Sequence, residues 1–261
     1  MTFLTFDKAE LVNLEYSLAR EALRSNRAGS FASTTIAGCN TRKYHGMLIC
    51  PVEHLDGENH VLLSSLDISV IQHEKIFNLG IHKYEGDLYV PRGHKYIRDF
   101  DAEKGSRTTY RVGGVVLTRE MMLVQKKEQI LVKITLEDAH SDTRVQFRPF
   151  LAFRNIHKLS KANLYLNRQY ADVPNGIKLR MYDGYPELHM QLSKNAEFVP
   201  VPDWYYNLEY LEEQQRGYDF KEDLYVPGYF ELPMKKGESI IFSASTAEEK
   251  PAGLKRRFKA E

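Results

Sequence analysis

The chain has 261 residues, of which 43% are hydrophobic, and its 36 basic and 35 acidic residues leave a formal net charge of +1. This hydrophobic fraction excludes an intrinsically disordered chain, and the length suits one large β domain or two ordinary ones. The balanced charge argues against a nucleic-acid-binding protein. No segment reaches the ~18 consecutive apolar residues of a membrane span.

Most of the predicted elements are strands. Runs rich in β-branched and aromatic residues predict strands, in chain order, over 45–52, 61–71, 115–124, 129–137, 143–153 and 238–245. Residues 176–182 and 187–192 flank Asp183-Gly184, a pair that predicts a hairpin. Within 143–153, Val145 and Phe147 are interleaved with polar residues, so one face of this strand should be buried.

Helical periodicity is scarce. Residues 7–23 predict a short helix, because four leucines fall near one face, and Trp204, Leu208 and Leu211 also have helical spacing. Strands without regular intervening helices predict antiparallel sheets rather than parallel βαβ units. We therefore predict an all-β fold, a large antiparallel two-sheet β-sandwich with few short helices.

One domain is assigned to residues 1–246. The charged segment 247–261 has no strand pattern and predicts a linker or the start of a helix that leads into a further domain. The N-terminus lacks the basic start and apolar run of a secretory signal, so a cytoplasmic location is expected. Cys39 and Cys50 fit neither a disulfide framework nor a zinc pattern, and no metal or cofactor is expected.

The first of three polar clusters covers residues 26–46. Small residues and hydroxyls fill its first half, and its candidate binding residues are Asn26, Arg42, Tyr44 and His45. The spacing matches neither a P-loop nor a dinucleotide fingerprint. A polar loop in the wall of a cleft is one interpretation, and an ordinary turn whose side chains satisfy loop carbonyls is the alternative.

The second cluster ends the strand predicted over 143–153. Arg154 could hold a carboxylate through two hydrogen bonds, and His157 could donate to a sugar hydroxyl. The alternative is a strand end with a structural ion pair.

The third cluster, residues 204–230, mixes aromatic rings with carboxylates. Rings stack on the C–H faces of sugars and carboxylates accept hydrogen bonds from hydroxyls, so this mixture favours a surface for a neutral polyhydroxyl ligand. Its candidate residues are Trp204, Tyr206, Glu212, Arg216, Asp219 and Asp223. A buried ring face beside a solvated acidic face is the alternative. Glycoside hydrolysis needs two carboxylates, and Glu212 and Asp223 could supply such a pair.

These three clusters resemble the motifs of one known family. Residues 26–33, 40–48, Arg148-Pro149 with Arg154 and His157, and 204–228 are similar in order and spacing to the N-terminal domain of bacterial and archaeal glycogen debranching enzymes of the amylo-α-1,6-glucosidase type. Two positions depart from the pattern, since Ala22 stands where the family usually has tryptophan and Ser30 where it has a second glycine.

The resemblance implies a supersandwich, galactose-mutarotase-like domain that precedes an (α/α)6-barrel glucosidase domain carrying the catalytic carboxylates. The chain would then be non-catalytic, pack on the barrel, and help to bind an α-glucan such as glycogen or a maltooligosaccharide for α-1,6 hydrolysis. An exposed apolar patch, and a homodimer of the isolated domain through it, would follow. A stand-alone carbohydrate-binding module and a catalytic domain using Glu212 and Asp223 remain the alternatives.

Overall fold

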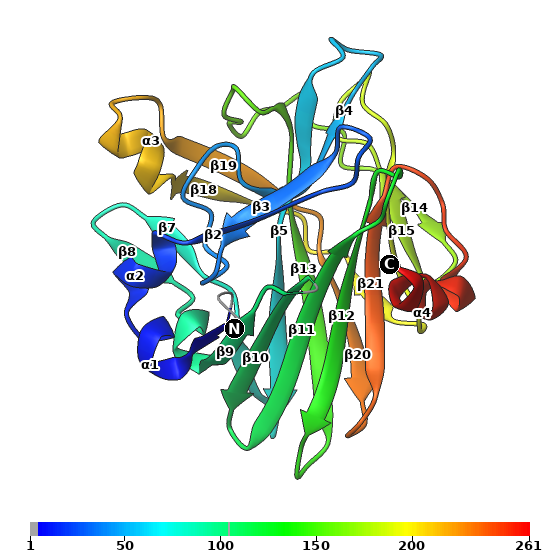
Figure 1. Cartoon of the computed structure of the whole chain (residues 1–261). Helices are drawn as coiled ribbons and strands as arrows, with labels where there is room; N and C mark the ends of the chain where they lie inside the picture. The colour runs from blue at the N-terminus through cyan, green and yellow to red at the C-terminus, as the bar shows by residue number, and fades with distance from the viewer. Residues whose placement is uncertain (1–4, 104) are drawn as a thin grey trace.

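The computed structural model describes residues 5–103 and 105–261. In this part of the chain two large antiparallel sheets stack face to face, and short helices lie at the periphery (Figure 1). The predicted all-β class and the two-sheet sandwich are confirmed.

The first sheet contains nine strands among the described residues, in the order β1-β9-β10-β11-β12-β21-β16-β15-β14. Their bounds are Thr5–Asp7 (β1), Ile97–Asp101 (β9), Ser106–Val112 (β10), Val115–Leu123 (β11), Gln129–Asp138 (β12), Ser239–Ser245 (β21), Leu188–Leu192 (β16), Gly176–Leu179 (β15) and Tyr170–Val173 (β14). The predicted hairpin is present as β15 and β16, although β15 ends at Leu179 and a connection of residues 180–187 follows.

The second sheet has the order β17-β20-β13-β5-β4-β3-β2, with β19 also pairing with β13, β18 with β19, and β6 with β5. Its strands are Glu197–Val199 (β17), Tyr229–Met234 (β20), Thr143–Asn155 (β13), Asn59–Gln72 (β5), Gly46–Pro51 (β4), Phe31–Thr35 (β3), Glu21–Ser25 (β2), Lys221–Val226 (β19), Asp203–Glu209 (β18) and Lys75–Asn78 (β6). A separate hairpin joins His82–Tyr84 (β7) and Leu88–Val90 (β8).

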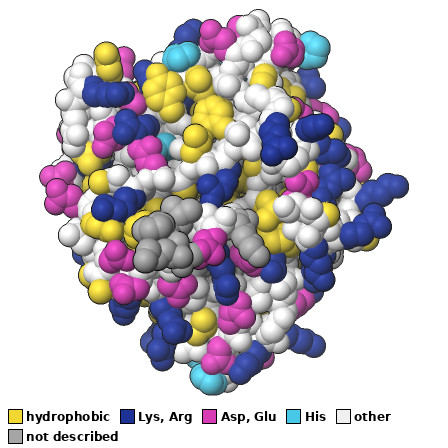
Figure 2. Space-filling model, in the orientation of Figure 1, with side chains coloured by type: hydrophobic (Ala, Val, Ile, Leu, Met, Phe, Trp, Pro, Cys, Tyr) yellow, Lys and Arg dark blue, Asp and Glu magenta, His cyan; other side chains and the backbone are white. Residues whose placement is uncertain are grey.

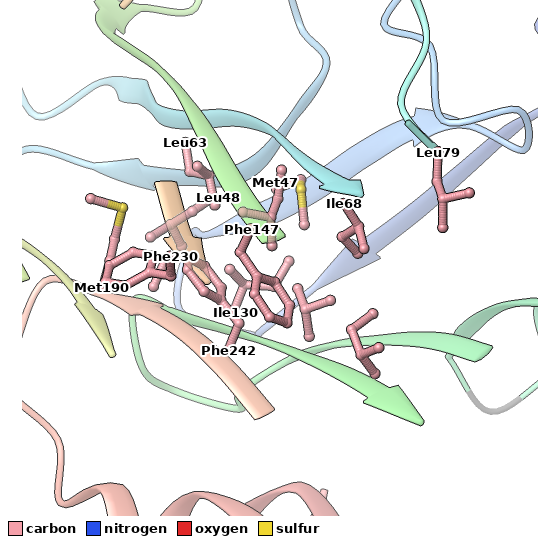
Figure 3. Packing of buried hydrophobic residues seen from close by; sticks show 14 of the residues in the cluster. Met47, Leu48, Leu63, Ile68, Leu79, Ile130, Phe147, Met190, Phe230 and Phe242 are labelled. Atoms are coloured by element: carbon pink, nitrogen blue, oxygen red, sulfur yellow. The ribbon is translucent and has the colours of Figure 1, made fainter. Parts of the chain in front are cut away.

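The main hydrophobic core lies between the two sheets. Phe147 of β13 and Phe242 of β21 stack with ring centroids 5.9 Å apart, and Phe230 of β20 packs edge-on against Phe242 (Figure 3). Val145 and Phe147 are both fully buried, as the alternation along residues 143–153 predicts. Close packing of such rings across the sheets fixes the framework on which the loops sit.

The helix predicted over residues 7–23 is only partly present. Two short helices occur, α1 (Lys8–Leu11) and α2 (Leu14–Leu18), and the chain then enters β2 at Glu21. Asp7 caps α1 and Asn13 caps α2, so the helix restarts instead of continuing. From Glu21 onwards, pairing with β3 replaces helical hydrogen bonds.

The helix predicted from the spacing of Trp204, Leu208 and Leu211 is wrong for residues 203–209. This segment forms β18, and the helix α3 (Leu211–Gln215) begins later. Between Tyr205 and Leu208 the strand carries one extra residue, which shifts the register against β19. A bulge of this kind reverses the alternation of side chains. Trp204 therefore joins the main core while Leu208 joins a second cluster on the opposite face, and their spacing of four mimics a helix.

The C-terminal segment ends in a helix that packs on the sandwich. In α4 (Pro251–Ala260), Leu254 and Phe258 are buried against Val124, Leu131 and Ile241 on the outer side of the first sheet. Gly93–Tyr96 forms a short 3-10 turn. None of the helices in residues 5–103 and 105–261 has the length and apolar character needed to cross a membrane. That residues 247–261 lead into a further domain remains a prediction.

Candidate functional site

Three segments far apart in the sequence meet around one surface depression. They are the loop before β4, the loop that follows β13, and the turn between α3 and β19. The depression has a volume of about 810 Å³ and is lined by Lys43, His157, Lys158, Leu159, Lys161, Gly217, Tyr218, Asp219, Phe220 and Lys221. Figure 2, in the orientation of Figure 1, shows hydrophobic side chains gathered in the upper part of the face, between the positions of α3 and β4. Each of the three polar clusters in the sequence contributes to this lining.

A buried carboxylate holds the three segments together. Glu222 of β19 is fully buried and pairs with the buried guanidinium of Arg154 at the end of β13. Its oxygens also accept hydrogen bonds from the phenol of Tyr210 and from the backbone and hydroxyl of Ser160. Arg154 Nη2 donates to the carbonyl of Lys43 at 2.8 Å, which attaches the first segment. Burial and the Glu222 charge raise the pKa of Tyr210 well above its usual value.

Bulges aim these side chains inward. In β13 the register against β5 shifts between Leu151 and Arg154, where Phe153 has a left-handed φ of 46°. Asn207, in the bulge of β18, has a φ of 55°. Left-handed backbone at non-glycine residues is uncommon and is often found beside functional sites.

Asp223 closes the β18 bulge. One of its carboxylate oxygens accepts from the backbone of Asn207 at 2.8 Å and the other from the backbone of Ala162 at 3.0 Å. The side chain is buried. Both oxygens of this carboxylate therefore hold local backbone, and the geometry gives Asp223 a structural role rather than that of an acid in a catalytic pair.

Arg42 and His45 share Glu21 of β2. The guanidinium of Arg42 lies 2.6 Å from Glu21 and 3.4 Å from Glu212, and His45 Nε2 lies 3.5 Å from the same Glu21 oxygen. The contact with His45, followed by that with Arg42, lowers the pKa of Glu21 to about 2. Thr41 N donates a hydrogen bond to His45 Nδ1 at 3.0 Å, so the buried side chain of His45 stabilises the loop before β4.

His157 lines the depression, and Tyr44 contacts it from behind the lining. The Tyr44 hydroxyl lies 3.2 Å from His157 Nδ1, and the two rings meet edge to face with centroids 5.6 Å apart. Lys43 Nζ lies 5.3 Å from the ring centroid of Tyr44 and 5.6 Å from that of Tyr218. An ammonium and two rings are therefore presented together.

The structure places other predicted residues away from the depression. Asn26 is fully buried and stabilises its own turn. Its side-chain oxygen accepts hydrogen bonds from the backbone N–H groups of Ala28 and Ser30, and its side-chain nitrogen donates one to the carbonyl of Lys127. Trp204 is 8% exposed and packs against Tyr225 in the core, so its predicted place at a binding edge is corrected. Trp204 lies opposite Tyr225 in the register of β18 with β19, before the bulge, and its ring belongs to the main core.

The remaining predicted residues lie on the surface. Tyr206 is 55% exposed but does not line the depression. Asp219 lines it, and the exposed Arg216 precedes the turn at Gly217. Glu212 is partly exposed and pairs with Arg42.

Sequence reasoning missed several lining residues, which lie inside the three clusters except for Lys161, two residues beyond the second cluster. They are Lys43, Lys158, Lys161, Tyr218, Phe220 and Lys221. In the sequence these lysines stand close to aromatic residues, a pattern that indicates a basic, ring-containing surface. The many acids in residues 204–230 directed the interpretation towards carboxylates instead. Most of those acids are used internally, and only Asp219 lines the depression as a carboxylate.

No group of three or more His, Cys, Asp or Glu side chains that could hold a metal ion occurs among residues 5–103 and 105–261.

Comparison with models of known protein families identifies the family of this chain. Residues 20–241 match the family model described as "Glycogen debranching enzyme N terminal". The chain belongs to this family. The glycogen debranching enzyme N-terminal match includes all three segments that form the depression, from Lys43 to Lys221.

Comparisons with whole proteins add two distant likenesses. A bacterial glucoamylase solved with acarbose shares 8% identity at a TM-score of 0.44, covering 90% of this chain and 32% of its own. A polysaccharide lyase shares 8% identity at a TM-score of 0.31, covering 82% of this chain and 28% of its own. The chain thus spans about a third of the length of these proteins. No curated protein matches it.

Proposed function

We propose that this chain is a non-catalytic, glucan-binding module of a glycogen debranching enzyme. In this proposal it packs on a helical-barrel glucosidase domain in the cytoplasm and contributes one wall of the site for α-1,6 hydrolysis. The observation that carries the proposal is the convergence of three family motifs on one depression, around the buried pair of Arg154 and Glu222.

The chemistry of the rim suits a glucan. Tyr218 is 59% exposed and offers a ring for stacking on a sugar face, and Tyr44 and His157 offer polar groups to hydroxyls. The volume of the depression, about 810 Å³, lies in the range of small-molecule sites.

The internal use of the acids supports the non-catalytic part of the proposal. Glu222 and Asp223 are buried and hydrogen-bonded to neighbouring segments, and Glu212 is paired with Arg42. A general acid or base needs a carboxyl group that reaches the scissile bond.

Calorimetric titration with maltoheptaose tests the binding. The Tyr218→Ala variant should weaken binding about tenfold, the loss of one stacking contact. Tyr170→Ala is the matched control, because Tyr170 is exposed on the edge strand β14 and does not line the depression. Equal affinities of the wild type and Tyr218→Ala would refute the assignment of the site.

Glucose release from a limit dextrin tests the absence of catalysis. The chain alone should give no turnover. Turnover that disappears in Glu212→Gln would establish a catalytic role for that carboxylate and overturn the proposal.

A further inference from the structure

The depression carries an excess of positive charge that a neutral glucan does not need. Four lysines, Lys43, Lys158, Lys161 and Lys221, and one acid, Asp219, line it. An ammonium donates hydrogen bonds but accepts none, and it attracts anions over several ångströms. Neutral hydroxyls draw little benefit from four such groups in one concavity.

Neighbouring carboxylates reach only two of these lysines. Lys161 lies 3.7 Å from Asp223, and Lys221 lies 3.3 Å from Glu85 and 3.5 Å from Glu209. Two of these acids are already engaged, because Asp223 accepts two backbone hydrogen bonds and Glu209 pairs with Lys83 at 2.7 Å. For Lys43 and Lys158, no carboxylate of the described residues lies within 4.0 Å.

The backbone of Lys43 is fixed on both sides. Its N–H donates to the buried Glu213 at 3.4 Å and its carbonyl accepts from Arg154 at 2.8 Å. Its ammonium lies beside the rings of Tyr44 and Tyr218. This places a cation and a sugar-stacking ring within reach of the same ligand, without a large ordering cost on binding.

His157 adds a further polar group. Its Nδ1 faces the Tyr44 hydroxyl, and its Nε2 makes no hydrogen bond to any described residue. Positioned on the lining, this imidazole can donate to an anionic oxygen.

We propose that the depression binds a glucose unit that carries a phosphoryl group, with Lys43 and Lys158 contacting the phosphoryl oxygens and Tyr218 the sugar. The proposal rests on the proposed glucan-binding function and names the substrate class of that site. A concave, ring-lined site favours a compact anionic sugar over an acidic protein surface, which would need a broad flat area.

Calorimetry with four probes tests the proposal: inorganic phosphate, glucose 6-phosphate, maltoheptaose and maltoheptaose bearing one 6-phosphoryl group. The phosphorylated oligosaccharide should bind about tenfold or more tightly than maltoheptaose, the effect of one charge-assisted contact. Glucose 6-phosphate should bind more tightly than inorganic phosphate. The advantage of the phosphorylated oligosaccharide should shrink when salt is raised.

Lys43→Met and Lys158→Met should each reduce this advantage, measured for each variant as the ratio of its affinities for the phosphorylated and the unphosphorylated oligosaccharide. Lys158 is exposed, so its variant should fold even if the Lys43 variant does not. Lys75→Met, which removes an exposed charge from β6 outside the depression, is the matched control and should leave the advantage unchanged.

The outcomes separate this proposal from the broader one. Equal binding of the two oligosaccharides would overturn the phosphoryl proposal and leave the glucan proposal standing. Absence of binding of both would overturn both proposals. Lysine-dependent binding of a poly-glutamate peptide as strong as that of the phosphorylated sugar would show a general anion surface and overturn the sugar class.

Discussion

Glu222 illustrates, at the residue scale, how one carboxylate can organise a site without touching a ligand. Its two oxygens accept hydrogen bonds from Arg154, Ser160 and Tyr210. Arg154 in turn donates a hydrogen bond to the carbonyl of Lys43. Buried charge is tolerated when it is both paired and fully hydrogen-bonded. The position of Lys43 at the rim thus depends on a side chain that is absent from the lining.

Replacement of Glu222 by glutamine should therefore destabilise the fold strongly. The guanidinium of Arg154 would remain buried without its counter-charge, which costs ~3–5 kcal/mol of unfolding free energy. Urea denaturation measures the loss. Glu212→Gln is the matched control, because Glu212 is partly exposed and contacts Arg42 at 3.4 Å, and its loss should stay below ~1 kcal/mol. Similar losses in the two variants would contradict the assigned role of Glu222.

The lowered pKa of Glu21 predicts that the stability of the folded chain decreases in acid. The pKa of its carboxyl falls from the ordinary 4.5 to about 2 in the folded chain. A lowered folded pKa gives stabilisation that is complete above about pH 4.5 and is lost as the pH falls towards about 2. The difference in stability between the wild type and Glu21→Gln should accordingly shrink over this window. Thermal melts at intervals between these pH values test this, and a constant difference would refute it.

At the scale of elements, the bulge of β18 sets which side chains of the strand face the main core and which face the second cluster. Asn207 takes a left-handed conformation that asparagine and glycine adopt readily and β-branched residues do not. Asn207→Val should cost ~1–3 kcal/mol, while Asn207→Gly should be nearly neutral. Chemical denaturation distinguishes these cases. Tyr206→Val, at the neighbouring exposed position, is the control, and a cost equal to that of Asn207→Val would argue against backbone strain as the cause.

The helix α4 should contribute to the stability of the sandwich. Leu254 is buried against Val124 and Leu131, so Leu254→Ala should leave a cavity and cost ~2–5 kcal/mol. Lys255→Ala, on the exposed side of the same helix, should change stability by no more than ~0.5 kcal/mol. Equal stability of the wild type and Leu254→Ala would mean that α4 is a loosely attached tail.

Local sequence patterns predicted the long strands well and the irregular ones poorly. β12 and β13 are rich in β-branched, aliphatic and aromatic residues, and both were located by their composition. The bulge in β18 depends on the hydrogen bond from Asn207 to Asp223, a residue sixteen positions away. A pattern within seven residues cannot contain that information, and the shifted alternation was therefore interpreted as a helix.

The motifs located the segments of the site but not the role of each side chain. His157 and Asp219 were selected from their clusters and line the depression, and Tyr44 contacts His157. Trp204 was selected for its chemistry, yet its ring packs in the main core. The importance of Glu222 depends on Arg154, and no local signal distinguishes this glutamate from its acidic neighbours.

At the scale of the whole molecule, an apolar tip, Leu164 and Tyr165, lies three residues beyond Lys161 of the depression in the sequence. Leu164 and Tyr165, in the loop after β13, are 97% and 90% exposed. Two adjacent exposed apolar side chains are a candidate for the apolar patch expected from the sequence. If the isolated chain forms the expected homodimer through this tip, Leu164→Ser with Tyr165→Ser should make it monomeric.

Sedimentation velocity over a range of concentrations measures this effect. The double variant should weaken self-association at least about tenfold, the effect of removing one apolar anchor. Val12→Ser with Leu23→Ser is the control, because these exposed side chains lie in the N-terminal elements. Self-association that persists in the tip variant and disappears in the control would place the interface elsewhere.

The bonds around Arg154 join residues that are 111 and 68 positions apart in the chain. Contacts of such long range form late, because the intervening loops must close first. A growing polypeptide therefore gains its ligand-binding concavity only after most of the sandwich has assembled. Affinity for a sugar probe would then report completed folding, and a ligand present during refolding should slow unfolding more than it accelerates folding.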